Sequence, residues 1–269
     1  MGQVGDAGAA HESHVWGRGD YSYLSKRLEP AAGMLADACA VSAGQEVLDV
    51  AAGDGNFALA CAREGASVIA SDIAAGMVER GRARSEREGY EIEWLEADAQ
   101  QLPFEDARFD CAGSVFGAMI APDPERVAAE LFRVVRPGNT VGLTAWVPDG
   151  LFSQMFDIAR RFAPPAPSGV RSEQWGDEAV VRGRLDGLAA RVECERRTLT
   201  WIADSPQSLE AELSESAPAS VAARERLTAG AYAELRALTL DLFEHHNRAG
   251  DGTLRLEAEY LITVARKRG

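Results

Sequence analysis

The stretch that most restricts the fold of this chain is residues 47–61, VLDVAAGDGNFALAC. An apolar run ends at Asp49, a turn of small residues follows at 51–55, and a helical pattern begins near residue 57. A buried strand, a small-residue turn and a helix in this order form the nucleotide-binding unit of doubly wound α/β folds, because glycine lets the backbone turn sharply and approach a ligand. The stretch therefore predicts a ligand site at the carboxyl end of this strand.

The pattern around this unit predicts a parallel sheet. Short apolar runs alternate with helical patterns, which is typical of parallel strands joined by right-handed helical crossovers. Gly65, Gly89 and Pro137-Gly138 mark the expected helix ends. We expect strands at 46–51, 67–71, 92–97, 109–115 and 140–147, and helices at 57–64, 74–88 and 124–135.

The chain changes character after Pro148. Residues 148–175 are too long and too apolar for a simple turn, so we interpret them as the start of a helical cap insertion. Two later strands are expected to pair as a hairpin at one edge of the sheet. The expected elements are helices near 177–189, from Ser205-Pro206 onward, near 219–229 and near 231–247, and strands near 191–202 and 254–266.

Two regions precede the sheet. Residues 1–20 show no period and are interpreted as a mobile arm, whereas 24–40 is expected to be a helix. We therefore divide the chain into an N-terminal arm or lid at 1–24 and an enzymatic domain at 25–269. In that domain, 46–147 forms the cofactor-binding core, and 148–269 forms the cap and the C-terminal strands.

The charge at the turn indicates the kind of ligand. Asp49 and Asp54 would repel a pyrophosphate and attract a cationic nucleoside. S-Adenosylmethionine carries a sulfonium and an ammonium group and no phosphate, so it suits an acidic turn. The spacing Gly53-x-Gly55-x-x-Ala58 also matches the dinucleotide fingerprint, so an NAD(P)-dependent reductase stays open as the alternative.

Two further aspartates follow the next two strands. Asp72 stands 23 positions after Asp49, where an acid in doubly wound folds accepts hydrogen bonds from both ribose hydroxyls. It could equally cap the helix that begins near Ala74. Asp98 could accept the exocyclic amine of adenine while the next backbone amide donates to the ring. A turn or cap role for Asp98 is an even alternative.

Taken together, these motifs resemble the class I S-adenosylmethionine-dependent methyltransferases. The resemblance is greatest to the small-molecule group that contains the ubiquinone and menaquinone C-methyltransferases. It implies a Rossmann-like, mostly parallel α/β sheet of seven strands, whose last strand, 254–266, inserts antiparallel. Ala51 departs from the family pattern at the first glycine of the turn, and Asn139 departs where a second glycine is usual. The stretches that carry the resemblance are VLDVAAGDGN at 47–56, SD at 71–72, EADAQQLPF at 96–104, FDCAGSVFGAM at 109–119 and ELFRVVRPGN at 130–139.

The resemblance also implies the cofactor residues. It places Asp72 at the ribose and Asp98-Ala99 at the adenine. It places Ser114, Val115 and Phe116 beside the cofactor. The full expected set is Tyr21, Asp49, Ala51, Gly53, Asp54, Gly55, Asn56, Asp72, Ile73, Met77, Asp98, Ala99, Gln100, Ser114, Val115 and Phe116.

Apolar and aromatic side chains at the strand ends, the arm and the cap are the candidates for acceptor binding. An aromatic wall would also shield a sulfonium by cation–π contact, although core packing is the plainer explanation of these residues. We expect the arm to close over the site, with Tyr21 and Trp16 lining it. His14 is the one candidate general base. The expected substrate residues are Trp16, Phe116, Met119, Trp146, Phe152 and Trp175.

The composition of the chain limits the kinds of partner that it can bind. The chain has 42 acidic and 28 basic residues and a net charge of −14, which disfavours nucleic acid and anionic membranes. No zinc-binding or disulfide pattern joins the four cysteines, His11 and His14 have no third ligand, and no signal peptide is seen, so we expect a cytoplasmic protein without metal. We expect a monomer or homodimer that transfers the methyl group of S-adenosylmethionine to an N, O or C nucleophile of a small molecule in specialised metabolism. A non-catalytic cofactor-binding module is a further alternative.

Overall fold

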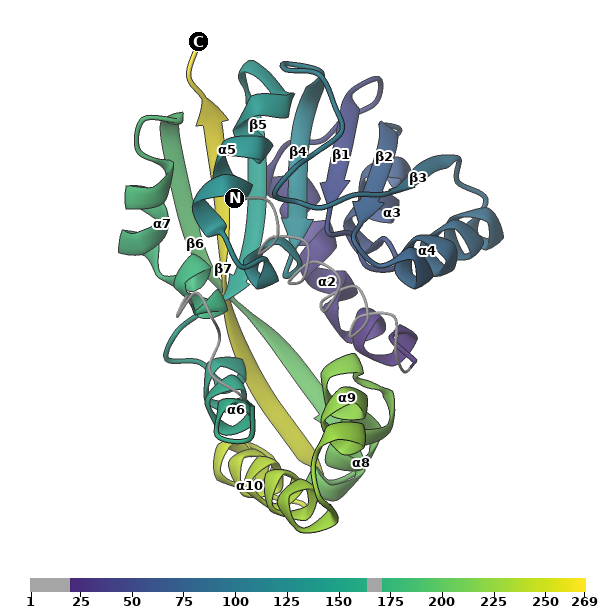
Figure 1. The fold of residues 1–269 in the computed structure, drawn as a ribbon, viewed down its shortest axis with the longest axis vertical. Helices are drawn as coiled ribbons and strands as arrows, with labels where there is room; N and C mark the ends of the chain where they lie inside the picture. The colour runs from purple at the N-terminus through teal and green to yellow at the C-terminus, as the bar shows by residue number, and fades with distance from the viewer. Residues whose placement is uncertain (1–19, 164–170) are drawn as a thin grey trace.

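The central feature of the computed structural model is a single mixed sheet. The structure describes residues 20–163 and 171–269. They form seven strands in the order β3-β2-β1-β4-β5-β7-β6 (Figure 1). β1 to β5 run parallel to one another, and β7 runs antiparallel to both β5 and β6. This confirms the predicted topology, including the antiparallel last strand. The strands are β1 (Glu46–Val50), β2 (Ser67–Asp72), β3 (Ile92–Glu96), β4 (Phe109–Val115), β5 (Val135–Trp146), β6 (Ala189–Ala203) and β7 (Leu254–Lys267).

Helices cover both faces of the sheet. In Figure 1, α5 and α7 lie in front of the sheet and α2 and α3 lie behind it. Gly65 and Gly89 end the helices α3 and α4 in the left-handed conformation, as predicted. The helices of this part are α2 (Ser22–Ala38), α3 (Asn56–Arg63), α4 (Ala75–Glu88), α5 (Pro124–Val134) and α7 (Glu178–Leu185), with short 3₁₀ turns η1 (Ala118–Ile120) and η2 (Ser172–Gly176).

The boundary between α5 and β5 differs from the prediction. We expected Pro137-Gly138 to end the helix and a strand to start at residue 140, but α5 ends at Val134 and β5 begins at Val135. Val135 already pairs with Phe109, and the register then shifts before Cys111 pairs with Thr140. Proline has no N–H for the sheet, so the irregularity at this point lets the strand pass through Pro137.

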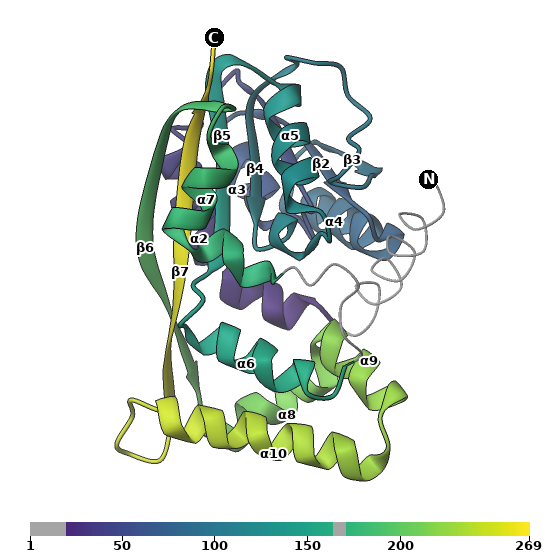
Figure 2. The same ribbon diagram turned by 60° about the vertical axis from the view of Figure 1, so that its left-hand side comes forward.

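A second group of helices forms a cap beside the sheet. β5 stops pairing with β7 at Trp146↔Tyr260, but β6 and β7 pair onward to Ala203↔Leu254. Because β7 is antiparallel, this ribbon extends beyond the carboxyl ends of the parallel strands, and Figures 1 and 2 show the cap helices around it. The cap helices are α6 (Leu151–Arg160), α8 (Pro206–Ser216), α9 (Pro218–Arg226) and α10 (Ala229–His246).

The predicted cap elements are present. Ser205 caps α8 by accepting a hydrogen bond from the Ser208 amide, and Pro206 is the first residue of that helix, as the sequence indicates. The expected edge hairpin is the β6–β7 pair, with β6 at the edge of the sheet. None of the helices in the described parts of the chain has both the length and the apolar character that a membrane crossing needs.

Candidate cofactor site

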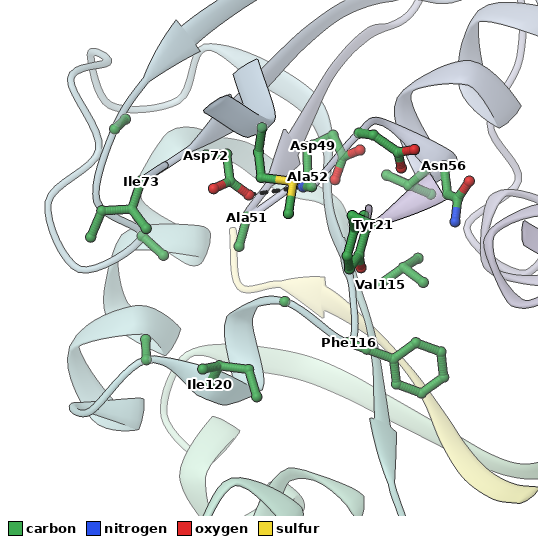
Figure 3. Close-up of a pocket in the computed structure, with 18 of the residues that line it drawn as sticks. Tyr21, Asp49, Ala51, Ala52, Asn56, Asp72, Ile73, Val115, Phe116 and Ile120 are labelled. Atoms are coloured by element: carbon green, nitrogen blue, oxygen red, sulfur yellow. Dashed lines mark hydrogen bonds between the residues drawn. The ribbon is translucent and has the colours of Figure 1, made fainter. Parts of the chain in front are cut away.

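One cavity lies at the carboxyl ends of β1, β2, β3 and β4, where open α/β sheets bind ligands. Together with its open mouth it holds about 860 Å³ of empty space. Figure 3 shows Asp49, Asp72 and Asn56 on one side of it, Phe116 and Ile120 on the other, and Tyr21 between them. The lining residues are Tyr21, Leu28, Asp49, Ala51, Ala52, Gly53, Asp54, Asn56, Phe57, Asp72, Ile73, Met77, Ala97, Asp98, Ala99, Val115, Phe116, Gly117, Ile120 and Ala121.

The turn between β1 and α3 is the floor of the cavity. Gly53 and Gly55 have φ angles of 58° and 93°, which glycine adopts without steric cost. Ala51, which stands where the family has glycine, also has a left-handed φ of 53°. Gly117 packs against it so closely that a Cβ at residue 117 would lie 2.2 Å from the Ala51 carbonyl oxygen. The two loops therefore form one tightly packed surface.

Asp49 is a buried carboxylate at the end of β1, with 1% of its surface exposed. Its Oδ2 accepts a hydrogen bond from the Ala58 amide at 2.8 Å, which ties the strand to α3. No donor among the described residues reaches its buried Oδ1. Burial raises the pKa of Asp49 well above its usual range, and the nearby Asp72 and Asp54 raise it further. An incoming cation would satisfy both the orphan oxygen and the charge.

Asp72 joins β2 to both the turn and the next helix. Its Oδ2 accepts from the Gly53 amide at 2.8 Å, which is the dashed line at Asp72 in Figure 3. Its Oδ1 accepts from the Ala74 amide at 2.9 Å. The carboxylate lines the cavity, but the alternative role as the cap of α4 is wrong. The N-cap residue is Ala74, whose amide Asp72 binds, and no side chain among the described residues caps this helix. Burial raises the pKa of Asp72 to about 6, and the amide hydrogen bonds counteract that rise.

Asp98 follows β3 and lines the cavity between Ala97 and Ala99. Its Oδ1 accepts from the Gln100 amide at 2.8 Å, and the Gln100 side-chain amide donates to the same carboxylate. Gln100 thus orients Asp98 from outside the cavity lining. The geometry is a turn that keeps the Asp98 carboxylate at the edge of the cavity.

A polar cluster that the sequence did not reveal lies behind the turn. Ser25 on α2 donates to the Asp54 carboxylate, and its carbonyl oxygen accepts from Asn56 Nδ2 at 2.8 Å. Arg84 on α4 lies 3.2 Å from Asp54 and donates to Asn56 Oδ1 at 2.8 Å. Asp54 is therefore an ion-paired acid. The acidity that the sequence assigned to the turn is partly compensated within the protein.

Tyr21 stands at the N-terminal end of α2 and projects into the cavity (Figure 3). A Cβ at Gly53 would lie 3.1 Å from its ring, so the ring covers the turn directly. Burial, together with the charges of Asp54, Asp72 and Asp49, raises the pKa of its hydroxyl, which therefore stays protonated. Tyr21 thus lines this cavity, and its contact with the cofactor stays a prediction.

The wall opposite the acids is apolar and continues into a stack of aromatic rings. Phe116 lines the cavity in the left-handed conformation, with φ of 58°, which is rare for so large a residue, and its amide donates to Thr144 Oγ1 at 3.1 Å. The Phe116 ring stacks on Trp146 at 4.0 Å, and Trp146 stacks on Phe152 at 4.1 Å. Phe152 meets Trp201 edge to face. The stack connects the cavity to the cap.

Several predicted residues lie outside the cavity lining. Ser114 accepts a hydrogen bond from the Ala118 amide, Gly55 packs against Trp94, and Trp175 lies under Arg184. Met119, Trp146 and Phe152 are buried core residues. The cavity residues that were not predicted are Leu28, Ala52, Phe57, Ala97, Gly117, Ile120 and Ala121. His14 and Trp16 lie outside the described residues, so the arm, its closure and the His14 base stay predictions.

The described residues hold no group of three or more His, Cys, Asp or Glu side chains that could bind a metal ion. The site thus consists of carboxylates at the ends of successive strands, a glycine-containing turn and an apolar wall. This combination suits a cationic nucleoside: carboxylates can hold an ammonium group and ribose hydroxyls, and the apolar wall can face a sulfonium.

Several known proteins are similar to this chain in sequence or in fold. A family model described as a methyltransferase domain matches residues 47–138. An uncharacterized protein of Mycobacterium tuberculosis is 39% identical over 183 residues, 67% of each chain. The demethylmenaquinone methyltransferase of Clavibacter sepedonicus is 40% identical over 104 residues, 39% of this chain and 42% of that one. The solved YcgJ protein of Bacillus subtilis superimposes with a TM-score of 0.61 at 20% identity, covering 88% of this chain and 98% of that one.

These likenesses and the strand order agree with the resemblance found in the sequence. They exclude the alternative that the chain is an NAD(P)-dependent reductase, which the sequence of the turn alone did not exclude. S-Adenosylmethionine is accordingly the cofactor, and the relation to the demethylmenaquinone methyltransferases is distant. The chain belongs to the class I S-adenosylmethionine-dependent methyltransferases.

Proposed function

We propose that this enzyme methylates an N, O or C nucleophile of a small organic molecule in specialised metabolism. The observation that carries the proposal is the convergence of Asp49, Asp72 and Asp98, from the ends of three adjacent strands, on one cavity with an apolar far wall. The demethylmenaquinone methyltransferase of Clavibacter sepedonicus, whose name states a small-molecule substrate, supports it.

In the proposed arrangement the cofactor lies along the strand ends. The adenine lies between Ile73 and Ala99 with its exocyclic amine at Asp98, and the ribose hydroxyls bind Asp72. The ammonium group lies toward the Oδ1 of Asp49, which is buried and receives no hydrogen bond from the described residues. The sulfonium then faces Tyr21, Val115 and Phe116, and the acceptor approaches from the side of the cap.

The protein's contribution to the reaction is alignment and exclusion of water. The sulfonium is already an activated leaving group, so the acceptor atom needs only to be held in line with the methyl–sulfur bond. The apolar residues Phe116 and Ile120 keep water from the reacting atoms and leave the methyl group accessible. The Tyr21 hydroxyl stays protonated and can donate a hydrogen bond to the acceptor or to the cofactor.

Two experiments test the proposal. Titration calorimetry with S-adenosylmethionine, S-adenosylhomocysteine, NADH and NADPH should show binding of the first two ligands alone. Incubation of methyl-labelled cofactor with a panel of small amines, phenols and carbon acids should yield a labelled product and S-adenosylhomocysteine. Cofactor that binds and is never converted across the panel would support a non-catalytic binding module instead.

A further inference from the structure

We propose that Arg84 is a positioning residue for cofactor binding, which holds Asp54 and Asn56 in the orientation that the cofactor requires. The inference rests on the placement of S-adenosylmethionine in the cavity proposed above. Asp54 and Asn56 line that cavity, whereas Arg84 stands behind them on α4. Arg84 therefore acts through these two side chains.

The contacts of Arg84 join three parts of the fold. Its Nη1 donates to Asn56 Oδ1 at 2.8 Å and to Ser25 Oγ at 3.1 Å, and it lies 3.2 Å from Asp54 Oδ1. Ser25 donates in turn to Asp54, and its carbonyl oxygen accepts from Asn56. One guanidinium thus fixes the glycine turn, the first residue of α3 and the helix α2 relative to one another.

The burial of this cluster makes its charge balance important. Asp54 and Asn56 are 6% and 7% exposed, and the Arg84 side chain is 12% exposed. Burial raises the pKa of Asp54, while the hydrogen bond from Ser25 and the charge of Arg84 lower it. A buried carboxylate that loses its cation takes up a proton or moves toward water. Either change would alter the floor of the cavity at the place where the cofactor binds.

Arg63 provides a matched control because it shares the outer partners of Arg84. Arg84 Nε lies 3.1 Å from Glu88 and its Nη2 lies 3.8 Å from Glu29. Arg63 pairs with the same two glutamates, at 2.8 Å from Glu88 and 3.0 Å from Glu29, and these are its ion-pair partners among the described residues. Replacing either arginine removes one positive charge from the same acidic neighbourhood.

The test is the dissociation constant of S-adenosylhomocysteine, measured by calorimetry on the full chain. Arg84→Gln should raise it by about tenfold or more, since hydrogen bonds to charged groups are worth about 1.5–3 kcal/mol. Arg63→Gln should change it by less than about twofold, because exposed ion pairs contribute little. Arg84→Lys should bind with intermediate affinity, since an ammonium keeps the charge and loses the planar fork.

A double-mutant cycle separates positioning from general damage to the fold. If Arg84 acts through Asp54, then Asp54→Asn combined with Arg84→Gln should bind S-adenosylhomocysteine no worse than the weaker single variant. Additive losses, or an Arg84→Gln variant that binds within twofold of the wild type, would overturn the inference. If the wild type itself fails to bind S-adenosylhomocysteine, the proposed cofactor placement is wrong as well.

A charge-neutral variant keeps the inference testable if Arg84→Gln does not fold. Ser25→Ala removes the hydroxyl that contacts both Asp54 and Arg84 and leaves every charge in place. It should raise the dissociation constant by about fivefold, which corresponds to one hydrogen bond of about 1 kcal/mol. Unchanged affinity in Ser25→Ala would contradict the role of the cluster.

Discussion

Asp72 should bind the cofactor at the expense of the stability of the unliganded protein, and Asp72→Asn should separate the two effects. The buried carboxylate has its pKa raised from 3.8 to about 6. One pKa unit corresponds to 1.36 kcal/mol, so its ionisation at neutral pH opposes folding by about 3 kcal/mol. Asparagine carries no charge but replaces one hydrogen-bond acceptor with an amide that faces a backbone N–H, a loss of about 1–2 kcal/mol. We therefore expect the free energy of unfolding of Asp72→Asn to exceed that of the wild type by about 1–2 kcal/mol at pH 7.5.

The pH dependence has a definite sign. A carboxylate whose pKa is raised by folding stabilises the folded protein fully below the unfolded value near 4, and this contribution is lost as the pH rises through about 6. The advantage of Asp72→Asn should therefore shrink between pH 7 and pH 4.5. Urea unfolding of both proteins at several pH values measures it, and the other carboxylates affect both proteins alike.

Ligand binding should move in the opposite direction. Charge-assisted bonds to two ribose hydroxyls exceed neutral ones by about 1–1.5 kcal/mol each, so Asp72→Asn should weaken S-adenosylhomocysteine binding roughly 30- to 150-fold. In the wild type, affinity should fall as the pH drops below about 6, because Asp72 takes up a proton. The variant should lack that step. A variant that is less stable than the wild type at pH 7.5 and binds the ligand equally well would refute this reasoning.

Three further substitutions and one control variant test the geometry of the site. Ala51→Gly relieves the left-handed conformation at φ 53° and should stabilise the protein by about 0.5–1 kcal/mol in urea unfolding; a loss of stability would contradict the strain. Gly117→Ala places a Cβ 2.2 Å from the Ala51 carbonyl oxygen and should weaken S-adenosylhomocysteine binding by about tenfold or more. In calorimetry, Gly183→Ala should leave binding unchanged, because open space surrounds Gly183 among the described residues. Asp98→Asn should weaken binding about tenfold, less than Asp72→Asn, because one amine is involved; equal effects would argue against the assigned adenine position.

The parts of the site that were predictable from the sequence are those that local pattern encodes. Asp49, Asp72 and Asp98 each follow an apolar run, and a parallel sheet brings the carboxyl ends of such runs to one edge. The strand topology was predictable because the alternation of strands with helices, and the glycines at helix ends, are also local sequence patterns. The exception was the start of β5, where the strand passes through Pro137-Gly138, which resembled a helix end.

Contacts between distant residues were not predictable in this way. Ser25 and Arg84 lie 59 positions apart, and each meets the residues of the turn across 28 to 31 positions of the chain. A serine or an arginine on an amphipathic helix carries no local sign of such a partner. Trp146 and Phe152 were recognised as aromatics near the site, but their mutual stacking, which draws them into the core, depends on the relative placement of β5 and α6. Side-chain packing between elements decides which of several candidate aromatics reach a cavity.

The place of β7 in the sheet has a consequence for the synthesis of the chain. β7 follows all the other strands in sequence, yet it lies between β5 and β6. On a ribosome, β6 and the helices α8, α9 and α10 emerge before the strand that joins them to β5. Until β7 is synthesised, β6 has no strand to pair with. The 14 residues of β7 then pair with β5 on one side and with β6 on the other. A stop codon just before residue 254 would therefore leave the nucleotide-binding half largely intact in sequence and would detach β6 and the cap from the sheet.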